Sequence, residues 1–363
     1  DGASNTYGAG VKFQAGDGSN ATFNNLTFVD TGGIHLDANA GAAGDLWIDA
    51  TTDGAVGGIL TLTAASGNVT QTQSLAVTGA TSVTTSGSNA TIALANTSNS
   101  FGGAVTLSTT GGSGDVTIDG GTAALAIDTS SIGGDLTLTS GHVSGITDDG
   151  TVTVGGNLSA TTDAGSGVIN MGTLAVTGTV ALATHSSGDA TVVNASGLNF
   201  GNTTVTGALS ATASAGNITD TGVLTISGTS AFITSADDAD ITLDSATNAF
   251  TGAVSVTTNG SSGDVLLVNN GALAFGASTI DGTLSATATT GNITDTGTQT
   301  ISGAATYITT ADDASIILDG ASNTYGAGVK FQAGDGSNAT FTNLTFVDTG
   351  GIHPDVNAAA AGD

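Results

Sequence analysis

The chain contains no cysteine, no glutamate and no arginine, and its only lysines are Lys12 and Lys330. Without cysteine the chain forms no disulfide and carries no thiol chemistry. All 30 acidic residues are therefore aspartate, and the formal net charge is −28 at pH 7. A charge of that sign excludes ordinary electrostatic attraction to nucleic acid or to anionic membranes. We therefore expect no nucleic-acid partner.

Aromatic residues are also scarce, at 4%, there is one proline, and no apolar run approaches the length that spans a bilayer. We expect no membrane insertion in this segment. The abundant residues are short: 57 glycines together with alanine, serine, threonine, asparagine and aspartate, which favour turns. The hydrophobic fraction of 39% and the mean hydropathy of +0.24 argue against disorder. This composition indicates short strands separated by turns.

Two segments of the chain are nearly identical. Residues 319–363 repeat residues 1–45, so that position 319 corresponds to position 1. We interpret the span 1–318 as one period of a longer tandem array, and expect the chain, which begins with Asp1, to be a piece of a longer protein. The two copies differ only at Asn24/Thr342, Leu36/Pro354, Ala38/Val356 and Gly41/Ala359.

A shorter repeat lies inside this period. Residues 207–228, "GALSATASAGNITDTGVLTISG", align with residues 282–303, "GTLSATATTGNITDTGTQTISG". Residues 58–79 are a third copy and residues 134–156 a looser fourth. The alignment predicts one continuous solenoid of repeat units: 57–132, 133–205, 206–280 and a long unit 281–363, with 1–56 as the end of a preceding long unit.

Within each unit, short runs alternate between apolar and polar residues, as in "ILTLTA", and turn residues separate the runs. No helical periodicity of useful length is present. A coil of about 25 residues with three short strands is the rung of a parallel β-helix. We predict an all-β fold of this kind, with about 13 rungs and a rise of about 60 Å per period. Equivalent residues are expected to form inward columns: Leu60 with Leu209 and Leu284, and Val77 with Ile226 and Ile301.

The units resemble the repeats of the filamentous haemagglutinin family, large bacterial exoproteins of the two-partner secretion type. Residues 58–79, 207–228 and 282–303 carry the resemblance, followed by "ITLDSATNAFTGAVSV" at 241–256. The resemblance covers most of the chain. It implies a right-handed β-helix, export across the outer membrane, and a fibre that is extracellular or on the cell surface. The secretion domain of that family is not among these residues.

Clusters of aspartate recur at equivalent positions and are candidate ligands for Ca²⁺, which favours several oxygen ligands from loops. The alternative is ordinary turn chemistry, because the glycine-rich calcium-binding nonapeptide is absent. The candidate metal ligands are Asp237, Asp238, Asp240, Asp244, Asp312, Asp313 and Asp319, with Asp17 and Asp335 in the "AGDGSN" turns.

Five further residues are candidates for contacts with neighbouring fibres or glycans. Lys12 and Lys330 occupy one repeat position, close in sequence to Asp17 and Asp335, and each either forms a local or inter-rung ion pair or contacts a neighbouring fibre. Trp47, the only tryptophan, and the equivalent Tyr7 and Tyr325 lie in the most aromatic part of the period. Most aromatics are expected in the core, and any that are exposed mark an interface.

The sequence is compatible with three functions. The first is a non-catalytic extracellular fibre or stalk, whose main partner is itself, end to end and side by side. The second is a carbohydrate-active β-helix enzyme with aspartate acid–base pairs, although no catalytic motif is present. The third is an ice- or mineral-binding solenoid with outward threonine or aspartate ladders. Ca²⁺ is the one candidate cofactor, and no other is expected.

Overall fold

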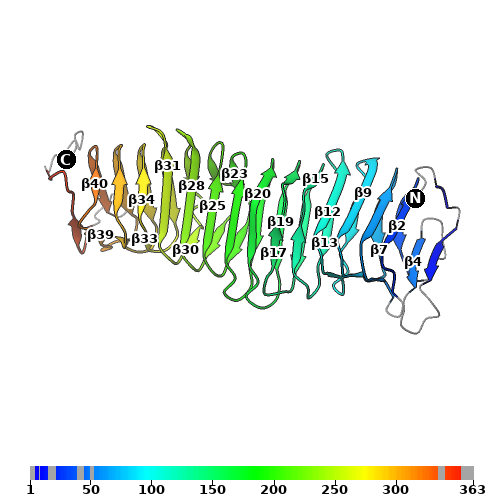
Figure 1. Ribbon diagram of the computed structural model, residues 1–363. Coiled ribbons are helices and arrows are strands. Elements are labelled where there is room, and N and C mark those ends of the chain that lie inside the picture. The colour runs from blue at the N-terminus through cyan, green and yellow to red at the C-terminus, as the bar shows by residue number, and fades with distance from the viewer. Residues whose placement is uncertain are drawn as a thin grey trace. The chain divides into compact units, whose positions relative to one another are not determined.

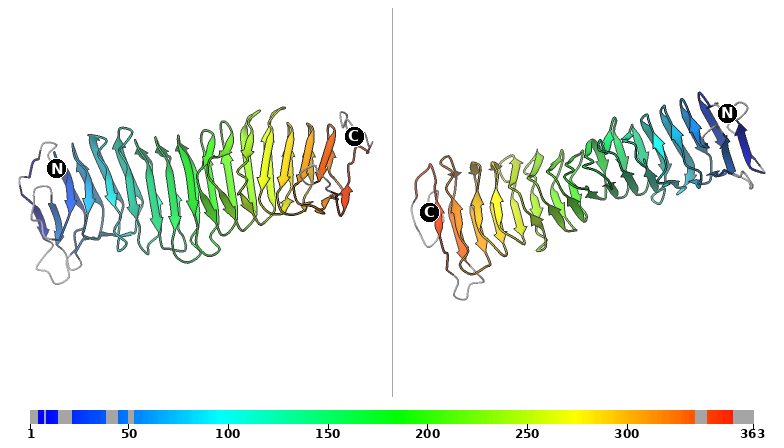
Figure 2. Two further views of the ribbon diagram at one scale, coloured as in Figure 1. Left: turned by 180° about the vertical axis from the view of Figure 1, so that it is seen from behind. Right: turned by 90° about the horizontal axis from the view of Figure 1, so that it is seen from below.

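The computed structural model describes residues 5–7, 9–14, 22–38, 45–49, 53–333 and 340–352. Within these residues the chain forms 42 strands and no helix. They fall into two compact units, Asp1–Gly188 and Asp189–Asp363. In each unit the strands lie side by side in parallel sheets (Figures 1 and 2). The all-β parallel solenoid predicted from the sequence is thus confirmed.

Alternating side chains explain the strands. In β6 (Leu60–Ala64), Leu60 and Leu62 are fully buried, whereas Thr61 and Thr63 are partly exposed. The Ser-Gly-Asn turn that follows ends the strand, and the chain crosses to the opposite sheet. The same pattern recurs in β25 (Leu209–Ala213) and β35 (Leu284–Ala288), which begin the matching units.

The first unit has two long sheets, 1a and 1b, and a small third sheet of two-residue strands. Sheet 1a contains β2 (Leu26–Asp30), β6, β9 (Thr81–Ser88), β12 (Val105–Thr110), β14 (Leu125–Ile127), β15 (Ser130–Ile132), β17 (Ile146–Asp148), β18 (Val152–Val154) and β20 (Ile169–Val176). Sheet 1b contains β1 (Val11–Gln14), β3 (Ile34–Leu36), β4 (Asp45–Asp49), β7 (Val69–Gln71), β10 (Ile92–Leu94), β13 (Val116–Asp119), β16 (Leu136–Ser140), β19 (Leu158–Thr162) and β21 (Thr179–Ala183). The small sheet contains β5 (Ala55–Val56), β8 (Ala76–Val77) and β11 (Ser100–Phe101).

The second unit has two sheets, 2a and 2b. Sheet 2a contains β22 (Ala190–Asn194), β25, β28 (Ser230–Asp237), β31 (Val254–Asn259), β33 (Leu273–Phe275), β34 (Ser278–Ile280), β36 (Ile293–Asp295), β37 (Gln299–Ile301), β39 (Ile316–Leu318), β40 (Thr324–Tyr325) and β42 (Leu344–Phe346). Sheet 2b contains β23 (Leu198–Phe200), β24 (Thr203–Val205), β26 (Ile218–Asp220), β27 (Leu224–Ile226), β29 (Ile241–Leu243), β30 (Ala249–Phe250), β32 (Val265–Asn269), β35, β38 (Ala305–Thr309) and β41 (Val329–Ala333).

Each regular turn of the coil has one longer strand on one sheet and two short strands on the other. In the second unit, β25 on sheet 2a is followed by β26 and β27 on sheet 2b, and then by β28 back on sheet 2a. A turn takes about 22 residues, and the two units comprise about 13 turns together. The sequence predicted three strands and about 25 residues per turn of the coil, which is roughly what the structure has, although each turn of the coil is somewhat shorter.

The shorter turn changes how the repeats stack. At about 22 residues per turn, the repeat that separates Leu209 from Leu284 makes about three and a half turns, not three, so equivalent segments fall on opposite sheets. β25 lies on sheet 2a while its equivalent β35 lies on sheet 2b, and in the first unit β6 and β16 are divided in the same way. The exchange occurs where two longer strands follow one another, as β31 and β32 do.

The inward columns must be corrected accordingly. Leu209 and Leu284 are each 2% exposed, as predicted, but they lie in different columns. Leu209 stacks between Ala190 and Ser230. Leu284 stacks between Val265 and Ala305 on the opposite sheet. Val77, Ile226 and Ile301 are likewise all buried, at 2% exposure or less.

Candidate functional sites: the acidic turns and the Trp47 surface

The acidic cluster of residues 237–240 forms the turn at the end of β28. Asp238 has a left-handed backbone, with φ of 60°. Its Oδ1 accepts the backbone N–H groups of Ser261 and Ser262, at 2.8 and 3.0 Å, from the next turn of the coil. These hydrogen bonds, led by that of Ser261, lower the pKa of the fully exposed Asp238 carboxyl. The carboxylate therefore joins one turn of the coil to the next.

The neighbouring aspartates make the same kind of link. The backbone N–H of Asp240 donates a hydrogen bond to Asn217 Oδ1, in the preceding turn of the coil, at 2.9 Å. Its own Oδ1 then accepts the N–H of Asp264, also at 2.9 Å, and Asp264 Oδ1 accepts the N–H of Thr283 at 2.7 Å. The result is a ladder of side-chain oxygens along one corner of the coil. We call this series, Asn217, Asp240, Asp264 and Thr283, the corner ladder.

The other members of the first cluster are also engaged. Asp237 Oδ1 accepts the side-chain amide of Asn259 at 2.8 Å. The N–H of Asp244 donates to Asp220 Oδ1 at 3.1 Å. Each contact joins residues of adjacent turns.

The cluster of the following repeat behaves similarly. Asp313 again has a left-handed backbone, with φ of 57°, and its Oδ1 accepts the hydroxyl of Thr340 at 3.0 Å. The N–H of Asp319 donates to Asp295 Oδ1 at 3.0 Å. Asp312 is exposed beside Asp313. Asp17 and Asp335 lie outside the described residues.

The equivalent turn of an earlier repeat has an asparagine where these have an aspartate. Asn89 has φ of 61°, and its Oδ1 accepts the N–H of Ser113 at 3.1 Å. An uncharged amide thus fills the role of Asp238, so the turn requires an acceptor and not a negative charge. In the part of the chain that the structure describes, no group of three or more histidine or aspartate side chains is placed to hold a metal ion. Calcium binding stays a prediction.

A second set of polar residues is buried inside the coil. Asn248 and Asn323 are fully buried, and their amides donate to the carboxylates of Asp220 and Asp295, both at 2.6 Å. Each asparagine oxygen also accepts a backbone N–H, that of Leu224 in the first case. Asp220 and Asp295 were not among the site residues predicted from the sequence. Their signal is a fixed spacing, because each precedes its asparagine by 28 residues.

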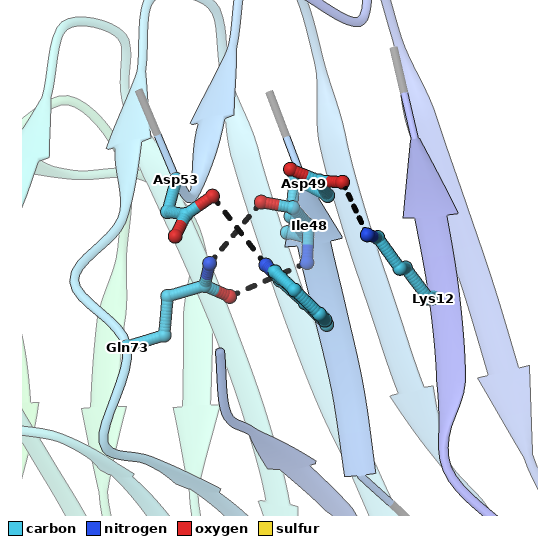
Figure 3. A network of polar contacts seen from close by, with 6 residues as sticks. Lys12, Ile48, Asp49, Asp53 and Gln73 are labelled. Atoms are coloured by element: carbon cyan, nitrogen blue, oxygen red, sulfur yellow. Dashed lines mark hydrogen bonds and ion pairs between the residues drawn. The ribbon is translucent and has the colours of Figure 1, made fainter. Parts of the chain in front are cut away.

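Tryptophan and lysine, which are both scarce in this chain, lie together on a surface formed by Lys12, Trp47, Asp49 and Asp53, which we call the Trp47 surface. Lys12 on β1 lies opposite Trp47 on β4 in the sheet register. Its Nζ lies 3.9 Å from the centroid of the Trp47 ring. It also forms an ion pair with Asp49 Oδ2 at 2.6 Å, which Figure 3 marks with a dashed line. The indole N–H of Trp47 points to Asp53 Oδ1 at 3.4 Å. A local or inter-rung ion pair was expected for Lys12, and the pair with Asp49 from the adjacent strand is of the inter-rung kind.

Gln73 supports the Trp47 surface from the inside of the coil. Its side chain is 6% exposed, and its amide bonds both sides of Ile48: Oε1 accepts the Ile48 N–H at 3.3 Å, and Nε2 donates to the Ile48 carbonyl at 3.1 Å (Figure 3). The amide thus replaces the backbone of a neighbouring strand. It holds β4, and with it Trp47 and Asp49, in place.

The remaining contact candidates divide between surface and core. Lys330 is exposed on β41. Tyr325 is a core residue, 2% exposed, and its hydroxyl lies 3.2 Å from that of the buried Tyr307. Burial raises the pKa of both phenols. Tyr7 is half-buried and stacks on Phe28 at 5.2 Å between ring centroids.

One hollow bears on the enzyme hypothesis. It measures about 480 Å³ and is lined mainly by glycine, alanine, serine and threonine, with His142 and Asp149 among them. The His142 Nδ1 accepts the N–H of Ser144 at 3.0 Å and so holds its own turn. Asp149 is the one carboxylate among the lining residues, whereas glycoside hydrolysis ordinarily uses two.

These features define the chain as a tandem-repeat parallel β-solenoid. A family model described as repeats of unknown function (DUF5649) matches residues 23–108, 187–257 and 262–332, which together are more than half of the chain. The chain therefore belongs to this family of repeats. No curated protein and no solved structure matches it. Within the described residues no helix is long and apolar enough to cross a membrane.

Proposed function

We propose that this chain is a structural, non-catalytic segment of a giant tandem-repeat bacterial surface protein. In this proposal, right-handed solenoid periods join end to end into an extracellular fibre or stalk that extends from or coats the cell and supports adhesion or a matrix. The filamentous haemagglutinin-like identity, with two-partner secretion, belongs to the proposal because the sequence resembles that family.

One observation supports this proposed structural role most directly. The two copies of the duplicated segment build the same aromatic cluster in separate places: Tyr7 lies 5.2 Å from Phe28, and the equivalent Tyr325 lies 4.9 Å from Phe346. A segment that folds alike wherever it recurs is suited to extension by duplication, since each rung of a solenoid contacts only its neighbours. The acidic surface, at a net charge of −28, fits a fibre that must stay dispersed.

The contacts of the acidic turns also favour a structural role. The corner ladder and the buried Asn248–Asp220 pair use aspartate to join successive turns, which leaves these carboxylates committed to the fold. Glycan or lateral fibre contacts would fall on the Trp47 surface, where a ring, a cation and two carboxylates meet. An ice-binding lattice is less well supported, because the exchange of sheets interrupts any flat threonine ladder at each repeat.

Electron microscopy of native material tests the proposal. We expect filaments with a layer line at ~4.8 Å. A period that spans positions 1–318, at about 22 residues per turn, should give an axial repeat of roughly 60 to 70 Å. Compact particles that lack both repeats would contradict a fibre and reopen the enzyme hypothesis.

A further inference from the structure

The two copies of the duplicated segment differ in how far they are covered. Leu26 is 6% exposed, but the equivalent Leu344 is 48% exposed. Ile34 is 1% exposed, but the equivalent Ile352 is 53% exposed. The residues are the same, so the difference lies in what packs against them.

In the first copy, the covering elements come from the next turn. β2 pairs with β6 in the register Leu26↔Leu60, and β3 pairs with β7 in the register Ile34↔Val69. The corner is closed as well, because the N–H of Ile59 donates to Asn25 Oδ1 at 2.8 Å.

In the second copy, the opposite side is covered instead. β42 pairs with β39 in the register Ile316↔Leu344, and β41 pairs with β38 in the register Ala305↔Val329. The turn is therefore formed, and its apolar residues Leu344, Phe346 and Ile352 remain partly or largely exposed on the other side. We call these three residues the open face.

We propose that the open face is a docking surface for the next period of the same repeat, which enters through a second copy of residues 46–77. The strand equivalent to β6 would pair with β42 in the register seen between β2 and β6. This inference rests on the proposed fibre and specifies how its periods join.

Two features favour this occupant over an unrelated partner. The stretch "LTFVD" at residues 26–30, which carries the β2–β6 register, recurs unchanged at residues 344–348, and none of the four differences between the copies falls in it. Asn343, the equivalent of Asn25, is exposed and would accept the N–H that Ile59 supplies in the first copy.

The lysines provide an independent argument. Lys12 on β1 is held by Trp47 and Asp49, which belong to β4 of the following turn. Lys330 occupies the equivalent place on β41 and is exposed. A second copy of residues 46–77 would bring an equivalent indole and carboxylate to Lys330. Docking of the next period would therefore bury the open face and pair Lys330 at the same time.

An extended chain tests the inference. Residues 46–132 are appended after Asp363, which continues the alignment of position 319 with position 1, and amide hydrogen exchange is measured by mass spectrometry. We expect exchange at residues 344–348 to slow by roughly tenfold or more, toward the rate at residues 26–30. An appended segment with Leu60→Asp and Leu62→Asp in the new copy should give no slowing. Equal exchange in the extended and original chains would overturn the proposal.

A matched pair of substitutions gives a second readout. In the original chain, Leu26→Asp should lower the melting temperature, while Leu344→Asp should leave it unchanged because Leu344 is half exposed. In the extended chain both should lower it. If Leu344→Asp remains silent there, while circular dichroism reports that the appended strands are folded, the docking is wrong. This outcome is separable from the fibre test, because native filaments could still give the layer line near ~4.8 Å.

Discussion

At the scale of single residues, the short polar side chains of this protein act as acceptors for the backbone of the next turn. Asn89 and Asp238 occupy equivalent left-handed positions and accept N–H groups in the same way. A carboxylate and an amide are therefore interchangeable there at neutral pH. The two side chains differ in acid, where the aspartate carboxylate gains a proton and the asparagine amide does not.

That difference predicts a pH effect. The folded pKa of Asp238 is lowered, so its stabilising contribution is full above the unfolded pKa of about 3.9 and is lost as the pH falls through the folded value. Asp238→Asn should keep the stability of the wild type at pH 7 and lose less of it in acid. Melting temperatures from pH 7 down to pH 2 check this. A steeper acid loss in the variant would contradict the assignment.

The buried tyrosine pair predicts an effect at the opposite end of the pH scale. Burial raises the pKa of Tyr307 and Tyr325, so stability is retained below the unfolded pKa of about 10 and falls as the pH rises above it. The preceding repeat has Phe232 and Phe250 at the equivalent positions. The double variant Tyr307→Phe/Tyr325→Phe should therefore be near-neutral at pH 7 and more resistant to alkali.

Single variants are the control for the pair. Tyr307→Phe alone leaves the Tyr325 hydroxyl without this partner in the core, which should cost about 1 to 3 kcal/mol, more than the double change. Urea unfolding at pH 7 and pH 11 measures both effects. Additive losses in the double variant would argue against a coupled pair.

At the scale of elements, close stacking of backbones sets the spacing of the turns. A Cβ placed on Gly228 would lie 2.5 Å from the backbone of Gly207, in the turn before it. Real Cβ atoms do not approach backbone so closely, so glycine at this corner allows the turns to reach sheet spacing. Gly112 offers a contrast, since a Cβ there meets nothing within 4 Å.

Gly228→Ala should accordingly destabilise the protein by about 1 to 3 kcal/mol through overpacking. Gly112→Ala should stay within about 0.5 kcal/mol of the wild type. Denaturant unfolding of the two variants compares them directly. Equal stabilities would show that the corner can relax and that backbone contact does not fix the turn.

The elements were largely predictable because alternation is a local property. Leu60, Leu209 and Leu284 were expected inside the coil, and all three are buried. The sheet on which each lies was not predictable, because it depends on the number of residues in one turn of the coil, which is about 22.

An inter-rung ion pair of Lys12 was among the predictions, but its partner could not be named from the sequence, for a related reason. Asp49 is distant from Lys12 in the sequence and reaches it only through the pairing of β1 with β4. Likewise, the positions of the acidic turns could be predicted from the sequence, but the groups that form hydrogen bonds with their aspartates could not. Those arise when adjacent turns stack.

At the scale of the whole molecule, the exchange of sheets at each repeat predicts where surface features recur. Since the chain has no cysteine, a single Thr61→Cys variant can be labelled with gold in arrays of several periods. We expect labels in one row, spaced by roughly 60 to 70 Å. Deleting residues 206–280 from every period should place successive labels on alternating sides. A single row in both arrays would contradict the half-turn offset.

The half turn also gives the period an arithmetic of its own. One sheet exchange separates β6 from β16 in the first unit, and one separates β25 from β35 in the second, so that each exchange moves the next repeat to the opposite sheet. If every repeat of an array exchanges sheets in this way, an odd number of repeats per period would place successive copies of the Trp47 surface on opposite sheets. We therefore expect inner repeats to be gained or lost in pairs wherever contacts must recur along one side.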